Sequence, residues 1–93
     1  MAIIHIPGKD VGHVMLYALS TCVWCGKTRK LLDDLGVAYD YEYVDLLKGE
    51  EKNKTIKVVE TWNPNCSFPT LVIKEKQCIV GFKEDDIRKA LAK

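Results

Sequence analysis

The stretch that decides the fold of this chain is Ser20-Thr21-Cys22-Val23-Trp24-Cys25. An apolar run from Val14 to Leu19 precedes it, and a helical pattern follows it through Leu35. The sequence therefore predicts a strand that delivers a Cys-x-x-Cys pair to the start of a helix. A helix N-terminus favours negative charge and lowers the pKa of a thiol placed there from its ordinary value of about 8.5. Cys22 is the expected attacking thiolate, and Cys25, one turn later and facing the sheet, is expected to close the disulfide.

A cysteine pair with this spacing is also half of a common zinc site. Zinc would need a second Cys or His pair at short spacing. Cys66 and Cys78 lie 12 residues apart, and His5 and His13 lie eight apart. The context of strand and helix therefore favours a redox pair, and we expect no metal site.

The composition is that of one small globular domain. The 93 residues are 47% hydrophobic and 29% charged, with a net charge of +1. Interspersed charges of both signs argue against nucleic acid or an anionic membrane as a partner. The chain opens without the pattern of a secretory signal, and no apolar run approaches about 18 residues. We therefore expect a cytoplasmic monomer whose cysteines stay mostly as thiols.

The N-terminal residues 1–12 are interpreted as an extension made of a short strand and a turn. Ala2 to Ile6 is apolar and β-branched, and Pro7 to Asp10 breaks the pattern. The turn allows this strand to pair with the next one as a hairpin. His5 and His13 are expected to be ordinary surface residues of the strands.

The helix after Cys22 has a clear apolar face. Lys27, Arg29 and Lys30 are expected on the solvated face, with at most a minor electrostatic share in the ionisation of Cys22. Trp24 is expected to be exposed and to meet a partner. Gly36 ends the helix as a C-cap. The residues predicted to face inward are Cys25, Thr28, Leu31, Leu32 and Leu35.

The remaining chain predicts a βαβ unit followed by two short antiparallel strands and a closing helix. Tyr39, Tyr41 and Tyr43 alternate with acidic residues and are interpreted as sheet packing. Cys78 is expected to be a small buried side chain, and Cys66 a secondary oxidisable thiol on a loop. The predicted elements are strand 37–44, helix 50–61, strand 71–74, a turn at 75–76, strand 78–80 and helix 84–92, the last with Ile87 and Leu91 inward.

These elements in this order, with three separated motifs, resemble the glutaredoxin branch of the thioredoxin-like superfamily. The motifs are Cys22-Val23-Trp24-Cys25, Phe68-Pro69-Thr70 and Gly81-Phe82. The resemblance covers nearly the whole chain from Val14 onward. It implies an α/β fold with a central four-stranded mixed sheet and helices on both faces. Residues 13–93 form the glutaredoxin-like domain in this interpretation, with residues 1–12 as its extension.

The resemblance implies roles for individual residues. Cys22 is the nucleophile and Cys25 resolves the mixed disulfide, so the two form a redox-active disulfide. Pro69 is expected to follow a cis peptide bond and to face the active site, which would expose the backbone of Phe68 to an extended substrate strand. The residues expected to bind substrate are Thr21, Val23, Trp24, Phe68, Pro69, Thr70, Gly81 and Phe82.

Some positions depart from the pattern of glutathione-dependent glutaredoxins. Leu19 stands where those proteins usually carry Lys or Arg, and Ser67-Phe68 stands where they commonly carry Thr-Val. Cys-Val-x-Cys and Gly81-Phe82-Lys83 resemble the NrdH-redoxin subgroup, which is reduced by a protein reductase. Asp85 and Asp86 fit either a glutathione amine, as in glutaredoxins, or a helix N-terminus.

The sequence thus predicts a dithiol-disulfide oxidoreductase that acts as an electron carrier for protein disulfides, such as those of ribonucleotide reductase or a peroxidase. No G-x-G-x-x-G follows a strand, so no bound cofactor is expected, and a reductase of thioredoxin-reductase or ferredoxin-linked type would supply the electrons. Three alternatives stay open: a glutathione-dependent glutaredoxin, a [2Fe-2S] module that uses Cys22 of two chains with glutathione, and a redox-inactive adaptor. Because no acid lies within residues 14–21, water or a backbone group is expected beside Cys25.

Overall fold

The computed structural model describes residues 3–65 and 67–91. A five-stranded mixed sheet with the strand order β1-β3-β2-β4-β5 lies at its centre. Strands β2 and β3 are parallel, and the other neighbouring pairs are antiparallel. The elements are β1 (Ile4–Ile6), β2 (Val14–Ala18), α1 (Val23–Leu35), β3 (Tyr39–Tyr43), a 3₁₀ turn η1 (Val44–Leu46), α2 (Gly49–Trp62), β4 (Thr70–Ile73), β5 (Gln77–Val80) and α3 (Glu84–Leu91).

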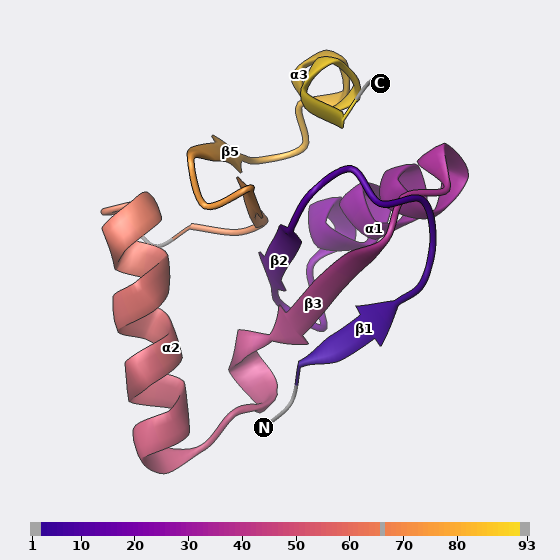
Figure 1. The fold of residues 1–93 in the computed structure, drawn as a ribbon. Coiled ribbons are helices and arrows are strands. Elements are labelled where there is room, and N and C mark those ends of the chain that lie inside the picture. The colour runs from indigo at the N-terminus through magenta and orange to yellow at the C-terminus, as the bar shows by residue number, and fades with distance from the viewer. Residues whose placement is uncertain (1–2, 66, 92–93) are drawn as a thin grey trace.

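Helices cover both faces of the sheet. Helices α1 and α3 pack on one face, and α2 lies on the other (Figure 1). The middle strand β2 is therefore buried on both sides, as its nearly continuous apolar run predicts. Leu16 and Ala18 belong to the core beneath α1 and α3, together with Ile87 and Leu91 of α3. The predicted helices and strands are all present, with bounds that differ by a few residues, and Ala92 lies outside the described residues.

Helix α1 begins and ends where the sequence predicts. Four of its five predicted inward residues are buried, and Leu35 is half-buried against the same core. Gly36 takes the left-handed conformation with a φ of 70°, which a residue without a Cβ adopts at little cost. Its N–H donates a hydrogen bond to the carbonyl of Asp33. The glycine thus stops the helix and turns the chain back towards β3.

The predicted hairpin between β1 and β2 is wrong. Strand β1 pairs antiparallel with β3, with Ile4 opposite Tyr41 and Ile6 opposite Tyr39, and it adds a fifth strand at the edge of the sheet. The linker of residues 7–13 is too long for a tight hairpin turn. It instead crosses to the start of β3, where the Lys9 N–H donates to the Gly36 carbonyl at 2.8 Å.

Glycine at position 8 permits this close crossing. A Cβ atom there would lie 2.6 Å from the carbonyl carbon of Val37, closer than side chains approach backbone. Lys9, the next residue, uses both of its backbone groups in this crossing, since its carbonyl also accepts from the Ala38 N–H at 2.9 Å. The N-terminal extension is therefore tied to the main sheet by backbone hydrogen bonds.

Arg29 does not lie on the solvated face where the sequence placed it. Its guanidinium sits 3.9 Å from the ring centroid of Tyr41, and its Nη1 donates to the Tyr43 hydroxyl at 2.9 Å. Burial works to lower the pKa of Arg29, but hydrogen bonds with the hydroxyls of Tyr39 and Tyr43 outweigh it and raise the pKa. The tyrosines of β3 pack in the sheet as predicted, and Arg29 covers them from α1.

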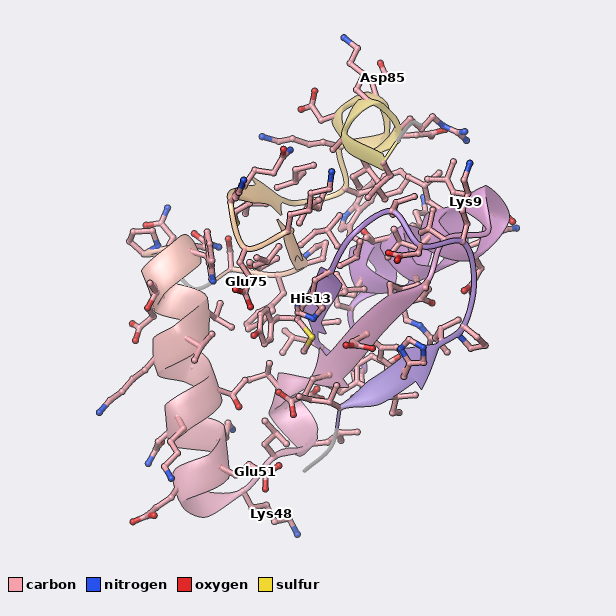
Figure 2. The ribbon with its side chains drawn as sticks, in the orientation of Figure 1. Lys9, His13, Lys48, Glu51, Glu75 and Asp85 are labelled. Atoms are coloured by element: carbon pink, nitrogen blue, oxygen red, sulfur yellow. The ribbon has the colours of Figure 1, made fainter. Side chains whose placement is uncertain are left out.

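The charged side chains are spread over the surface. Lys9 and Asp85 lie at one end of the molecule, and Lys48 and Glu51 lie at the other, near the start of α2 (Figure 2). Among the helices described, none is both long and apolar enough to cross a membrane.

Candidate active site

A tight turn between β2 and α1 presents Cys22. The Cys22 N–H donates to the Leu19 carbonyl at 3.2 Å, so Ser20 and Thr21 form the corner of the turn. Cys22 is the N-cap of α1, with extended backbone angles, and its Sγ accepts a hydrogen bond from the Cys25 N–H at 3.3 Å. The sulfur therefore takes the place that a Ser or Asp oxygen usually fills at a helix N-terminus, where negative charge is stabilised.

Cys25 lies in a very different environment from Cys22. Its side chain is only 1% exposed, whereas Cys22 is half-buried. The Leu19 N–H faces the Cys25 Sγ at 3.5 Å, which is the kind of backbone group expected there. Burial raises the pKa of Cys25 to about 12, helped by hydrogen bonding to Cys22 and by the charges of Cys22 and Asp45 and opposed by the Leu19 N–H. Cys25 is therefore a protonated thiol at neutral pH, and Cys22 is the accessible sulfur.

This difference predicts the pH dependence of alkylation. In Cys22→Ser, the rate at which iodoacetamide modifies Cys25 should keep rising up to about pH 11, because burial, the largest cause of the raised pKa, remains. When the same protein is unfolded in guanidinium chloride, the pH dependence of this rate should instead report the ordinary thiol pKa of about 8.5 to 9. Mass spectrometry of quenched samples measures both curves. A plateau below about pH 9.5 in the folded protein would contradict the raised pKa.

The same pKa difference has a consequence for stability. The folded pKa of Cys25 lies above the unfolded one, so the folded state holds the proton more tightly. The protonated Cys25 thiol therefore stabilises the folded state fully at any pH below the unfolded pKa, and this contribution is lost as the pH rises towards the folded pKa.

Aromatic and backbone groups from three segments form a groove beside the cysteines. The Phe68–Pro69 peptide bond is cis, as the resemblance implies, and the Gly81 N–H donates to the Pro69 carbonyl at 2.9 Å. The rings of Trp24 and Phe82 stack with centroids 6.0 Å apart. A cavity of about 280 Å³ is lined by Trp24, Phe68, Pro69, Gly81 and Phe82. The fold thus brings together five of the eight residues expected to bind substrate.

The other three expected residues lie outside that cavity. Val23 is 70% exposed and Thr21 is exposed, both at the start of α1. Thr70 is fully buried, and its hydroxyl donates to the Ser67 carbonyl at 2.7 Å. Asn63 also donates to that carbonyl, at 3.0 Å. Thr70 and Asn63 therefore hold the loop that carries Phe68 and Pro69.

Sequence reasoning missed Asp45, which contacts the turn before Cys22. The Asp45 carboxylate accepts hydrogen bonds from the Ser20 N–H at 2.8 Å and the Ser20 hydroxyl at 2.5 Å. The prediction that no acid lies beside Cys25 was based on residues 14–21, whereas Asp45 lies in η1, after β3. The parallel register aligns Ala18 with Tyr43, so the residues two places further on, Ser20 and Asp45, leave the sheet at the same edge. The predicted βαβ unit was the signal that could have found it.

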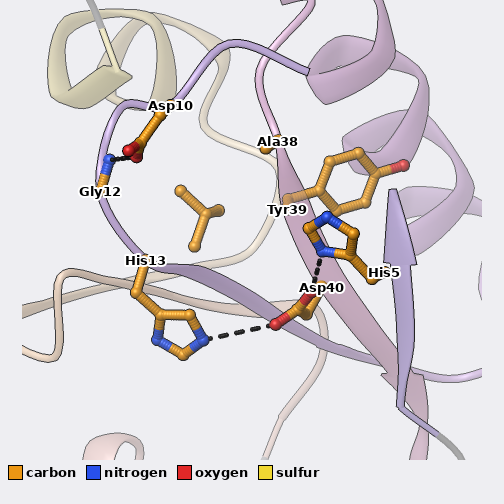
Figure 3. Close-up of a pocket in the computed structure, with 8 residues that line it drawn as sticks. His5, Asp10, Gly12, His13, Ala38, Tyr39 and Asp40 are labelled. Carbon is orange, nitrogen blue, oxygen red and sulfur yellow. Dashed lines mark hydrogen bonds and ion pairs between the residues drawn. The ribbon is translucent and has the colours of Figure 1, made fainter. Parts of the chain in front are cut away.

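A second polar cluster lies at the opposite end of β2. His5 Nδ1 lies 2.6 Å from Asp40 Oδ1, and His13 Nε2 lies 3.5 Å from Asp40 Oδ2 (Figure 3). His13 Nδ1 also lies 4.0 Å from Glu75 Oε1. Both histidines are exposed, as predicted, but their pairing with Asp40 was not foreseen. Within residues 3–65 and 67–91, no group of three or more His, Cys, Asp or Glu is placed to hold a metal ion.

The remaining cysteines are remote from the pair in sequence. Cys78 is half-buried in β5, and burial raises the pKa of its thiol. The prediction of a small buried side chain is therefore met only in part. Cys66, predicted to be a secondary oxidisable thiol, lies outside the described residues.

Comparisons with known proteins agree with this fold. A family model described as Glutaredoxin matches residues 14–78. The chain is similar to the crystal structure of a glutaredoxin from Methanosarcina mazei Go1, with 50% identity, a TM-score of 0.92 and coverage of 100% of this chain and 90% of that one. Methanoredoxin from Methanosarcina acetivorans gives 55% identity and a TM-score of 0.89, with 92% and 90% of the two chains covered.

A more distant archaeal structure extends the same likeness. A glutaredoxin from Archaeoglobus fulgidus shares 31% identity with a TM-score of 0.80, and 86% of each chain is covered. No curated protein matches the sequence. The α/β thioredoxin-like fold that the sequence predicted is confirmed. The likeness runs to archaeal glutaredoxins and methanoredoxin and does not single out the NrdH-redoxin subgroup.

Proposed function

The chain belongs to the glutaredoxin family, and we propose that it is an electron carrier that reduces disulfides in other proteins through Cys22 and Cys25. The observation that carries this proposal is the asymmetry between the two sulfurs. Cys22 sits half-buried at the N-cap of α1, while Cys25 is 1% exposed with its pKa raised to about 12 by burial. One sulfur is thus placed to attack a foreign disulfide, and the other is shielded from solvent.

The exchange proceeds in two balanced steps. The Cys22 thiolate attacks one sulfur of the target disulfide, forms a mixed disulfide and expels the other target sulfur as a thiolate, which takes a proton from water. Cys25 then gives its proton to solvent and attacks the Cys22 Sγ. This second attack forms the Cys22–Cys25 disulfide and releases the second target thiolate. The target has gained two electrons, and an external reductase must return two electrons to the Cys22–Cys25 disulfide.

The groove supports a protein as substrate. Trp24 is 54% exposed beside the apolar cavity, and Val23 is 70% exposed next to Cys22. Exposed aromatic and aliphatic side chains of this kind contact polypeptide at interfaces. The Phe68–Pro69 segment borders the same cavity and offers backbone groups to an extended strand. We propose a protein reductase as the electron donor, because the same exposed surface would contact donor and target in turn. We place this exchange in the cytoplasm.

Trapping tests the proposed function directly. Cys25→Ser leaves Cys22 able to attack but removes the sulfur that resolves the mixed disulfide. Incubated with cell extract, this variant should form covalent complexes that a dithiol releases, and Cys22→Ser should form none. Mass spectrometry of the released proteins identifies the targets. Trapping that is equal in the two variants would contradict the assigned roles.

Turnover assays assign the electron donor. The reduction of a model protein disulfide would be followed with three donors in parallel: glutathione with its reductase, a thioredoxin-type reductase, and a ferredoxin-linked reductase. We expect a protein reductase to support faster turnover than glutathione. Turnover with glutathione alone would instead identify a glutathione-dependent glutaredoxin. A protein that no donor reduces and that accelerates no disulfide reduction would be a redox-inactive adaptor.

A further inference from the structure

Asp45 is bound to the active-site turn from outside the motif. Its carboxylate accepts two hydrogen bonds from one residue, the Ser20 N–H at 2.8 Å and the Ser20 hydroxyl at 2.5 Å. These bonds lower the pKa of Asp45, so the carboxylate is ionised at neutral pH. Bonds to a charged acceptor are among the stronger ones that a protein makes. Asp45 is itself fixed by its place in η1, directly after β3.

Ser20, the residue that Asp45 binds, belongs to the turn that places Cys22. Ser20 is the first corner residue of the turn that the Cys22 N–H closes on the Leu19 carbonyl. The same turn orients the Leu19 N–H, which faces the Cys25 Sγ at 3.5 Å. A shift of Ser20 would therefore move the Cys22 sulfur relative to the start of α1 and the Leu19 N–H relative to Cys25. Misplacements of about 1 Å are enough to slow a reaction strongly.

We propose that Asp45 is a positioning residue of the redox site, which clamps the Ser20-Thr21 turn so that Cys22 stays at the N-terminus of α1 and which sets a fixed negative charge beside the cysteine pair. The inference rests on the proposed function, since it assigns a part in the same exchange. It adds a residue that belongs to neither the cysteine motif nor the substrate groove.

The charge of Asp45 has an effect that differs from that of its hydrogen bonds. It acts on Cys25 in the same direction as burial, favouring the protonated thiol. Lys52 of α2 is the cation that acts on Asp45 in turn. Removing the charge should therefore make Cys25 easier to ionise, while removing the clamp should misplace Cys22. Loss of the clamp should slow the first step, the attack by Cys22, and loss of the charge should speed the second step, the attack by Cys25. The two effects can therefore be separated.

One stopped-flow trace measures both steps without the physiological target. Dithiodinitrobenzoate is a disulfide that releases one coloured thiolate when Cys22 attacks it and a second when Cys25 resolves the mixed disulfide. Asp45→Ala removes both the clamp and the charge. Asp45→Asn removes the charge but keeps an oxygen that can accept from the Ser20 N–H, and its amide nitrogen can donate to the Ser20 hydroxyl in place of the second carboxylate oxygen. Ser20→Ala keeps the charge and loses only the hydroxyl bond.

We expect the first phase to slow about tenfold in Asp45→Ala, less in Ser20→Ala and least in Asp45→Asn, following the hydrogen bonds that remain. The second phase should speed up in Asp45→Asn, roughly threefold for each unit by which the pKa of Cys25 falls, because the gain in thiolate outweighs the loss of nucleophilicity. The matched control, Asp34→Asn, makes the same charge change at an exposed position late in α1 and should leave both phases unchanged.

Three results would overturn the proposal. The first is a wild-type trace for Asp45→Ala. The second is an equal loss of the first phase in Asp45→Ala and Asp45→Asn, since the clamp would then not be what matters. The third is a loss that follows the fraction of unfolded protein in circular dichroism at the assay temperature. Failure of the wild-type protein to reduce any protein disulfide would refute the proposed function while leaving these two phases measurable.

Discussion

Cys22→Ala should abolish the reduction of protein disulfides, lowering the rate by about a thousandfold or more. The variant lacks the only sulfur of the pair that lies within reach of a foreign disulfide. Cys25 cannot replace it, because its side chain is 1% exposed and burial raises the pKa of its thiol to about 12. The measurement is turnover of a model protein disulfide with the donor that serves the wild-type protein best.

Cys78→Ser is the matched control for that experiment. Cys78 is a half-buried thiol in β5, outside the motif, and should be dispensable for turnover. Circular dichroism of both variants checks that the fold is retained. Substantial turnover by Cys22→Ala, or an equal loss in Cys78→Ser, would show that the electrons pass through a different sulfur.

Leu32→Ala should destabilise the fold strongly, lowering the free energy of unfolding by about 2 to 5 kcal/mol. Leu32 lies on the inner face of α1, is fully buried, and belongs to the core shared with β2 and α3. Truncation removes its apolar contacts and leaves a cavity that the close-packed core only partly fills. Domains of this kind are stable by about 5 to 15 kcal/mol in total, so the loss is a large share. Urea unfolding followed by circular dichroism measures it.

Leu35→Ala gives the comparison at the end of the same helix. Leu35 is only half-buried, so its truncation should cost clearly less than that of Leu32. Equal losses in the two variants would mean that the packing of α1 on the sheet is not the source of the stabilisation. Both folded variants should retain the redox activity, because both residues lie at least seven positions beyond Cys25 along α1 and neither lines the cavity of the groove.

The sequence predicted most of the elements because their signals are local. The run before Cys22 is apolar at nearly every position, as a strand covered on both faces must be, and the inward residues of α1 recur at the helical period. Gly36 marked the end of α1 by the conformation that it alone adopts easily. The cysteine spacing and its place at a strand-helix junction were likewise visible in the chain, and they indicated which sulfur is at the N-cap.

Contacts between residues distant in the chain were decided only by the tertiary structure. Strand β1 pairs with β3 and not with β2, which is nearer in the sequence, and Arg29 packs on the tyrosines of β3 instead of pointing into solvent. Asp45 reached Ser20 across 25 positions. Each depends on the register of strands and on the packing of α1 against the sheet, which hydrophobic periodicity does not encode. The cysteine pair was therefore visible in the sequence, and the contact between Asp45 and the turn before Cys22 was determined by how the sheet is assembled.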